Sequence, residues 1–187
     1  AQQELDAALD NLFHHPNVGP FLALRLIQRR VTSNPTPAYV ARVADAFDDN
    51  RSGVRGALGA MVRAVLLDEE ARGGHLARPT IFGKLREPLI RTTHLWRAMD
   101  ARSEGGRIKT LEPWPPIQDW YGQGPLRSPS VFNFYLPGFS PLGEVSGAGL
   151  VAPEFQILTD STAVDTANRL FSLSFCGWSA PDEVFGG

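Results

Sequence analysis

The segment from Gly122 to Gln156 constrains the fold most, because it is long and rich in proline and glycine, yet remains apolar. It shows neither the period of an amphipathic helix nor the alternation of a strand. Its large apolar side chains are those of Phe132, Phe134, Tyr135, Phe139, Leu142, Leu150, Val151 and Phe155. Disordered segments are poor in such residues, and structureless loops of this length are uncommon in compact domains. We therefore expect an ordered coil whose rings are sheltered by helices, either as a cap over the bundle or as the part that carries specificity.

Apolar residues recur at helical spacing on both sides of this segment, and turn residues separate the runs. Asn17 and Thr36 are suitable N-caps, and Pro37 fits the first position of a helix. The glycines at positions 56 and 59 favour the close approach of another backbone, because each costs roughly 1 kcal/mol relative to alanine. Residues 69–84 are expected to form a loop. The expected helices cover residues 3–13, 18–31, 37–48, 54–67, 86–101 and 161–173.

The sequence thus predicts an all-α fold: a bundle of about six helices with a long ordered coil layer rich in proline, glycine and aromatic residues. We expect one helical domain over residues 1–187, with a bundle core at 1–103, irregular coil at 104–152 and a C-terminal helix within 153–176. The helix at 86–101 should bury Leu89, Thr93 and Trp96. The first and last helices should bury the apolar stripes Leu5, Ala8, Leu9, Leu12 and Phe13, and Val164, Ala167, Leu170 and Phe171.

Charge and cysteine content exclude several classes of function. A formal net charge of −2 supplies no field that would gather nucleic acid. No apolar run is long enough to span a membrane. Cys176 is the only cysteine, so it forms no internal disulfide, and the sequence assigns it no redox role. The acidic, amphipathic start differs from a signal peptide, and we expect the chain to be a fragment of a longer protein.

Candidate catalytic and metal-binding residues are weakly supported. Asp6, Asp10 and His14 lie at i, i+4 and i+8 on one side of a helix, a pattern that a solvated helix face also produces. His94 borders an apolar stripe, which is more typical of a structural histidine. No serine lies in a nucleophile elbow. The sequence therefore predicts no metal, no cofactor and no identifiable catalytic group.

Ligand-binding candidates are better supported within and before the coil. Arg127, Ser130, Asn133 and Tyr135 combine a guanidinium, a hydroxyl, an amide and a phenol among aromatic rings, a mixture that binds polar, ring-containing ligands. The alternative is that Arg127 pairs with Glu87 or Glu154 to fix the coil. Trp114 and Trp120 are candidates for stacking on sugar rings.

Several phrases of the chain are similar to one family. They are HPNVGPFLALRLIQRRVTSNPTPAYVARVADAF at 15–47, AVLLDEEAR at 64–72, KLREPLIR at 84–91, GPLRSPSVFNFYLPGFSPLGE at 124–144 and GLVAPEFQI at 149–157. Through them the chain resembles the C-terminal part of a bacterial family called domain of unknown function 1800 (DUF1800). The resemblance implies a bacterial protein, several hundred residues long and exported to the periplasm or beyond. It implies no catalytic residues.

From these observations we expect a non-catalytic binding or assembly module of an exported protein. Its partner would be another protein or a preceding part of its own chain, with a glycan as a further candidate. The alternative is a hydrolase whose remaining catalytic residues lie upstream, for which His94, Asp119 or Glu154 should line a cleft and carry shifted pKa values.

Overall fold

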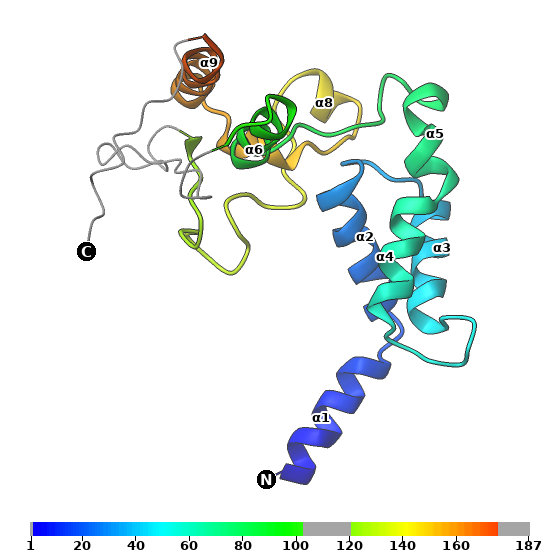
Figure 1. Ribbon diagram of the computed structural model, residues 1–187. Helices are drawn as coiled ribbons and strands as arrows, with labels where there is room; N and C mark the ends of the chain where they lie inside the picture. The colour runs from blue at the N-terminus through cyan, green and yellow to red at the C-terminus, as the bar shows by residue number, and fades with distance from the viewer. Residues whose placement is uncertain (1, 103–120, 176–187) are drawn as a thin grey trace. The chain divides into compact units, whose positions relative to one another are not determined.

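The computed structural model describes residues 2–102 and 121–175, which form helices, turns and coil without any strand (Figure 1). The predicted all-α class is therefore confirmed for this part of the chain. The chain divides into two compact units: unit 1 comprises Ala1–Lys84 with Gly147–Val151, and unit 2 comprises Leu85–Ser146 with Ala152–Gly187. The expected single domain stays a prediction.

Unit 1 contains α1 (Gln2–His14), α2 (Val18–Arg30), α3 (Pro37–Asp48), α4 (Leu58–Leu67) and α5 (Glu69–Ala77). The predicted start of α3 is confirmed, because the Thr36 side chain accepts a hydrogen bond from the backbone N–H of Tyr39 and Pro37 opens the helix. Asp68 ends α4 and caps α5 by accepting a bond of 2.9 Å from the backbone N–H of Glu70. Capping of this kind satisfies N–H groups that the helix itself leaves without acceptors.

The helix boundaries expected from the sequence are wrong for α4 and α5, and each of these regions contains a glycine with a specific role. α5 replaces the predicted loop at 69–84, and within it Gly74 gives room to the Phe82 ring, because a Cβ there would lie 2.3 Å from Phe82 Cε2. α4 begins at Leu58 and not at residue 54, because Gly56 has a φ of +80° and ends the preceding turn. The close approach of another backbone predicted at Gly56 and Gly59 is wrong: the neighbour of Gly56 is the Phe13 side chain, at 2.6 Å from an added Cβ, and nothing lies within 4 Å at Gly59.

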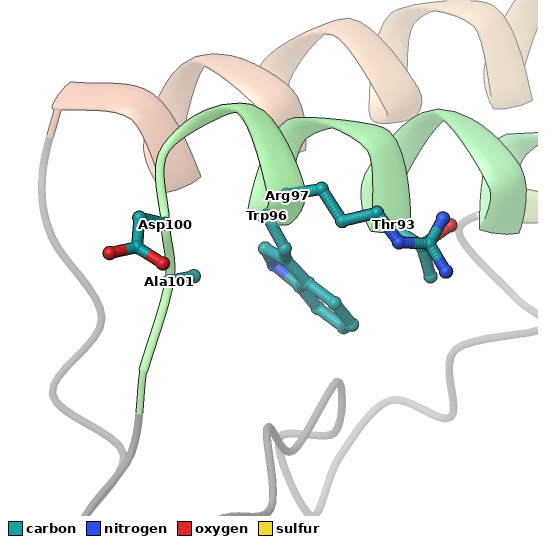
Figure 2. Close-up of a pocket in the computed structure, with 5 residues that line it drawn as sticks. All are labelled: Thr93, Trp96, Arg97, Asp100 and Ala101. Atoms are coloured by element: carbon teal, nitrogen blue, oxygen red, sulfur yellow. The ribbon is translucent and has the colours of Figure 1, made fainter.

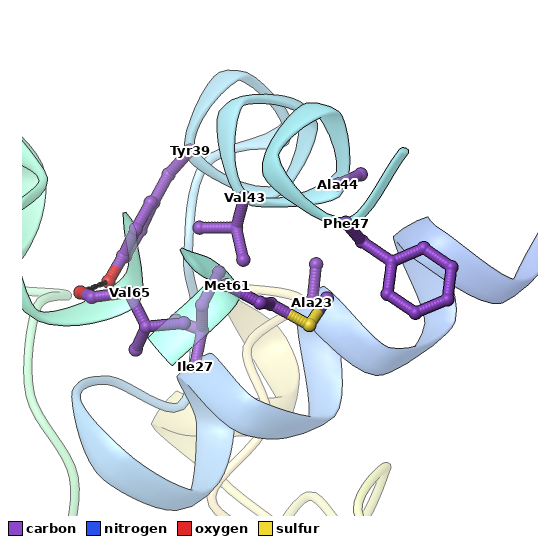
Figure 3. Packing of buried hydrophobic residues seen from close by; sticks show 8 residues of the cluster. All are labelled: Ala23, Ile27, Tyr39, Val43, Ala44, Phe47, Met61 and Val65. Atoms are coloured by element: carbon purple, nitrogen blue, oxygen red, sulfur yellow. Dashed lines mark hydrogen bonds between the residues drawn. The ribbon is translucent and has the colours of Figure 1, made fainter. Parts of the chain in front are cut away.

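The core of unit 1 lies where α2, α3 and α4 meet (Figure 3). Ile27, Val43 and Met61 are completely buried there. Tyr39 is also fully buried, and its hydroxyl donates a hydrogen bond to the carbonyl of Val65. Burial raises the pKa of Tyr39 well above its ordinary value, and the nearby Asp68 carboxylate adds to the effect. The phenol therefore stays a neutral donor that joins α3 to α4.

Polar contacts attach the remaining segments of unit 1 to this core. Asn34 donates to the carbonyl of Val151 and accepts from its N–H, both at 2.9 Å, which holds residues 147–151 against unit 1. Lys84 Nζ donates to the carbonyls of Gln28 and Arg29 at 3.0 Å, at the C-terminal end of α2. A cation at that position satisfies carbonyls that have no partner inside the helix.

Unit 2 contains α6 (Pro88–Ala98), most of the short helix α8 (Glu144–Gly147), the 3₁₀ turn η1 (Pro153–Ile157) and α9 (Asp160–Phe175). The expected sheltering of the coil's rings holds for Tyr135, which is buried, but is wrong for Phe132, which is 62% exposed. The stripe predicted on α9 is also wrong, since Val164 and Phe171 are exposed and Thr166 is buried instead. The helical period identified the apolar side of α9, but among the described residues of unit 2 little covers that side.

Candidate functional site

Most of the predicted ligand-binding residues do not gather into one site. Arg127 and Ser130 are exposed, Asn133 is half-buried with a φ of +72°, and Tyr135 is buried. The Ser130 hydroxyl accepts a bond of 3.1 Å from the N–H of Phe132, as a turn residue does. Trp114 and Trp120 lie outside the described residues. The ligand site proposed from the coil therefore stays a prediction.

Tyr135 has a structural partner at the beginning of α6. Its hydroxyl donates to Glu87 Oε1 at 2.5 Å, and Gln123 Nε2 donates to the other oxygen of the same carboxylate. Gln123 Oε1 in turn accepts from the N–H of Leu89 at 3.3 Å, in the first turn of α6. These bonds fix the coil to the helix start. The Glu87 carboxylate thus accepts hydrogen bonds from Tyr135 and Gln123, and the suggested pairing of Arg127 with Glu87 or Glu154 stays a prediction.

A hollow of about 370 Å³ lies on the C-terminal half of α6 (Figure 2). The Trp96 ring points away from the helix there, and the Arg97 side chain extends along the helix towards Thr93. Asp100 supplies a carboxylate that also binds Arg102 at 2.7 Å. The lining is completed by Ala101. An indole, a guanidinium and a carboxylate can hold a small polar ligand, but the described lining includes no histidine or thiol.

This hollow was not predicted from the sequence, which assigned Thr93 and Trp96 to a buried stripe. Both are only half-buried. The signal that could have revealed it is the spacing of Thr93 and Arg97 at i and i+4, which places two polar groups on one face of α6, with Asp100 just beyond the end of the helix.

The residues proposed for a hydrolase do not share the hollow. His94 is exposed on α6, Glu154 is 2% exposed within η1, and Asp119 lies outside the described residues.

The clear pKa shifts belong to Tyr39, Arg42, Asp68 and Arg91. Asp68 has a lowered pKa because it accepts hydrogen bonds from Arg42 at 2.7 and 2.8 Å, and burial lowers the pKa of Arg91. The hydrolase hypothesis gains no support from these positions and stays a prediction.

The most unusual surface of unit 1 is the outward side of α4. Met61 and Val65 are buried on its inner side, whereas Leu58, Val62 and Leu66 are 59%, 46% and 54% exposed. We call Leu58, Val62 and Leu66 the α4 stripe, because spacing of i, i+4 and i+8 aligns them along the helix. A helix that is apolar on nearly all sides is ordinarily buried on all sides. The α4 stripe therefore has the composition of a second buried face.

A second apolar stripe lies on α1. Leu5, Leu9 and Leu12 are 52%, 54% and 65% exposed, and no residue of α1 is buried. We call these three residues the α1 stripe; the predicted burial of this face is wrong within unit 1. The end of the helix is anchored by two contacts: the Phe13 ring packs edge-on against Phe47 at 5.9 Å between centroids, and Arg55 Nε donates to the carbonyl of Phe13 at 3.2 Å. From there α1 projects away from α2, α3 and α4 (Figure 1).

Clusters of metal ligands and membrane-spanning helices are absent from the described part of the chain. In residues 2–102 and 121–175, no three histidine, cysteine, aspartate or glutamate side chains gather as metal ligands would. That includes Asp6, Asp10 and His14. In the same part of the chain, every helix is too short or too polar to cross a bilayer.

Comparison with known proteins identifies the family of the chain. The family model described as "Protein of unknown function (DUF1800)" matches residues 1–182. No curated protein and no solved structure matches the chain.

Proposed function

This chain belongs to the DUF1800 family of proteins of unknown function, and on that premise we propose that it is a non-catalytic binding or assembly module. The module docks a polypeptide through the α4 stripe. The observation that carries the proposal is the burial pattern of α4: one apolar side forms the core with α2 and α3, and an equally apolar side is left exposed.

Burying the α4 stripe against a partner would release enough free energy to contribute substantially to binding. Full burial of a leucine or valine side chain contributes about 1.5–3 kcal/mol, and each of the three residues is about half exposed. Covering the α4 stripe would therefore contribute about 2–4 kcal/mol. This gain is available only to a partner with a complementary apolar surface, which is the chemistry of another protein segment.

The α4 stripe is also shaped for the approach of a helix. Gly59 follows Leu58 on the exposed side of the first turn, and nothing lies within 4 Å of the position that its Cβ would occupy. A glycine there lets a second backbone come closer than any other residue would. Glycine at this position costs some helix stability, which the closer packing of a partner would offset.

A photocrosslinking amino acid at position 62 tests the proposal in the full-length protein in its own cells. We expect a discrete adduct with another polypeptide or with another segment of the same chain, and Leu58→Asp in the same molecule should abolish it. The matched control is the same amino acid at position 76, because Leu76 is 78% exposed on α5 but lies outside the α4 stripe. Equal crosslinking at positions 62 and 76, or an adduct that survives Leu58→Asp, would refute the proposal.

A further inference from the structure

We propose that the α4 stripe is covered by α1 of a second copy of this chain, so that two copies exchange their first helices. The inference rests on the proposed function, since it names the partner of the same surface. A single kind of contact between two copies would then cover the exposed stripes of both α1 and α4.

The two stripes are similar in length and pattern. The α1 stripe runs from Leu5 to Leu12 and the α4 stripe from Leu58 to Leu66, which at 1.5 Å per residue correspond to about 10 and 12 Å. Each stripe consists of three residues at spacings of three or four, so that side chains of one can pack between those of the other. Two apolar stripes of similar length can thus cover one another.

The charges beside the two stripes are opposite. α1 carries Glu4, Asp6 and Asp10 and no lysine or arginine. The only charged residue of α4 is Arg63, which is exposed and follows Val62 directly. Arg63 is therefore the charge of α4 that an acidic helix would meet at the α4 stripe, whereas Arg55 is bound to Asp48. Asp6 is exposed and lies three residues before Leu9, beside the α1 stripe, and Asp10 is exposed one turn further along α1.

The anchoring of α1 directs it to another copy rather than to its own α4. Arg55 holds the end of α1 by bonds to the carbonyls of Phe13 and His15, and the Phe13 ring occupies the space beside Gly56. Three residues, 15–17, separate α1 from α2, and they span at most about 10 Å. With these contacts in place α1 points away from the core of its own unit 1, as Figure 1 shows.

Reciprocal exchange also explains how such a small contact can hold. An isolated helix of 13 residues is only marginally stable in water, so α1 gains its order from what it packs against. In a two-fold dimer each copy donates α1 and receives the partner's, so the contact occurs twice. Once the first α1 has docked, the second docks at a high effective concentration.

Analytical ultracentrifugation of the purified chain over a range of concentrations tests the inference. We expect a monomer–dimer equilibrium in which Asp6→Lys with Asp10→Lys, and separately Arg63→Glu, each raise the dissociation constant roughly tenfold or more, because like charges then meet at the contact. Mixing the two variants should restore dimers, since the changed α1 of one meets the changed α4 of the other. Circular dichroism should show that both variants remain folded.

Three outcomes would overturn the inference: a wild-type chain that stays monomeric, variants that dimerise as the wild type does, or a mixture that fails to recover dimers. Failure of this inference can be distinguished from failure of the broader proposal. A monomeric chain whose position 62 still crosslinks to another polypeptide refutes the second copy but retains the assembly module. A chain with no crosslink at position 62 refutes both.

Discussion

Met61→Ala is expected to lower the free energy of unfolding by about 2–5 kcal/mol, the cost of removing a large apolar side chain from a packed core. Met61 is completely buried between α2, α3 and α4, and no exposed neighbour can move in to fill the cavity without disturbing the helices. Urea denaturation followed by circular dichroism measures the loss.

Leu66→Ala is the matched control for this substitution, because it truncates another large apolar residue on the same helix. Leu66 is 54% exposed, and alanine favours helix slightly, so we expect a change of less than about 0.5 kcal/mol in the monomer. Equal losses of unfolding free energy for the two variants would show that both sides of α4 are buried within one chain. That result would contradict the description of α4 as a helix with one buried and one exposed apolar side.

Glu70→Ala should be the most damaging change of a polar residue, with an expected loss of about 2–4 kcal/mol. The Glu70 carboxylate accepts hydrogen bonds from the backbone N–H and hydroxyl of Thr36 and from Arg78 Nη1, at 3.0 Å for the arginine. Alanine removes all of these acceptors at once and leaves the half-buried groups of Thr36 and Arg78 without them. The residue therefore joins the start of α3 to the end of α5.

Glu69→Ala is the control, since Glu69 precedes Glu70 but its side chain is 86% exposed and its nearest cation, Arg42, lies 3.8 Å away. Exposed pairs of this kind contribute about 0–1 kcal/mol, so the two adjacent glutamates should differ clearly in thermal and urea unfolding. A small effect at both positions would mean that the Thr36–Glu70–Arg78 bonds do not hold α3 and α5 together in solution.

The helices could be predicted from the sequence where local chemistry determines them. Thr36 and Pro37 specify the start of α3 by capping and by a fixed φ, both of which act within one turn. α5 could not be predicted, because Gly73 and Gly74 indicate a loop when only propensity is considered. Gly74 leaves room inside α5 for the Phe82 ring, a contact that no local pattern reveals.

The candidate surfaces could be predicted only in part, because they also depend on contacts between residues far apart in the sequence. The helical period identified the α1 stripe correctly, but periodicity reports that a face is apolar and not what covers it. The period therefore predicted a core for residues such as Leu9, which the structure leaves 54% exposed. For the ligand site, residue type predicted Tyr135 as a binding residue, whereas its hydroxyl is held by Glu87, a residue 48 positions away. The hollow beside Trp96 depends on side-chain directions along α6, which composition does not encode.

Amide hydrogen exchange of the purified chain, measured below and above the concentration at which it associates, tests most directly whether the α1 and α4 stripes cover one another. We predict that residues 2–14 exchange rapidly in dilute solution and become protected on association, together with the exposed side of α4 from Leu58 to Leu66. Protection of residues 2–14 that is the same at every concentration, or that never appears, would contradict the account.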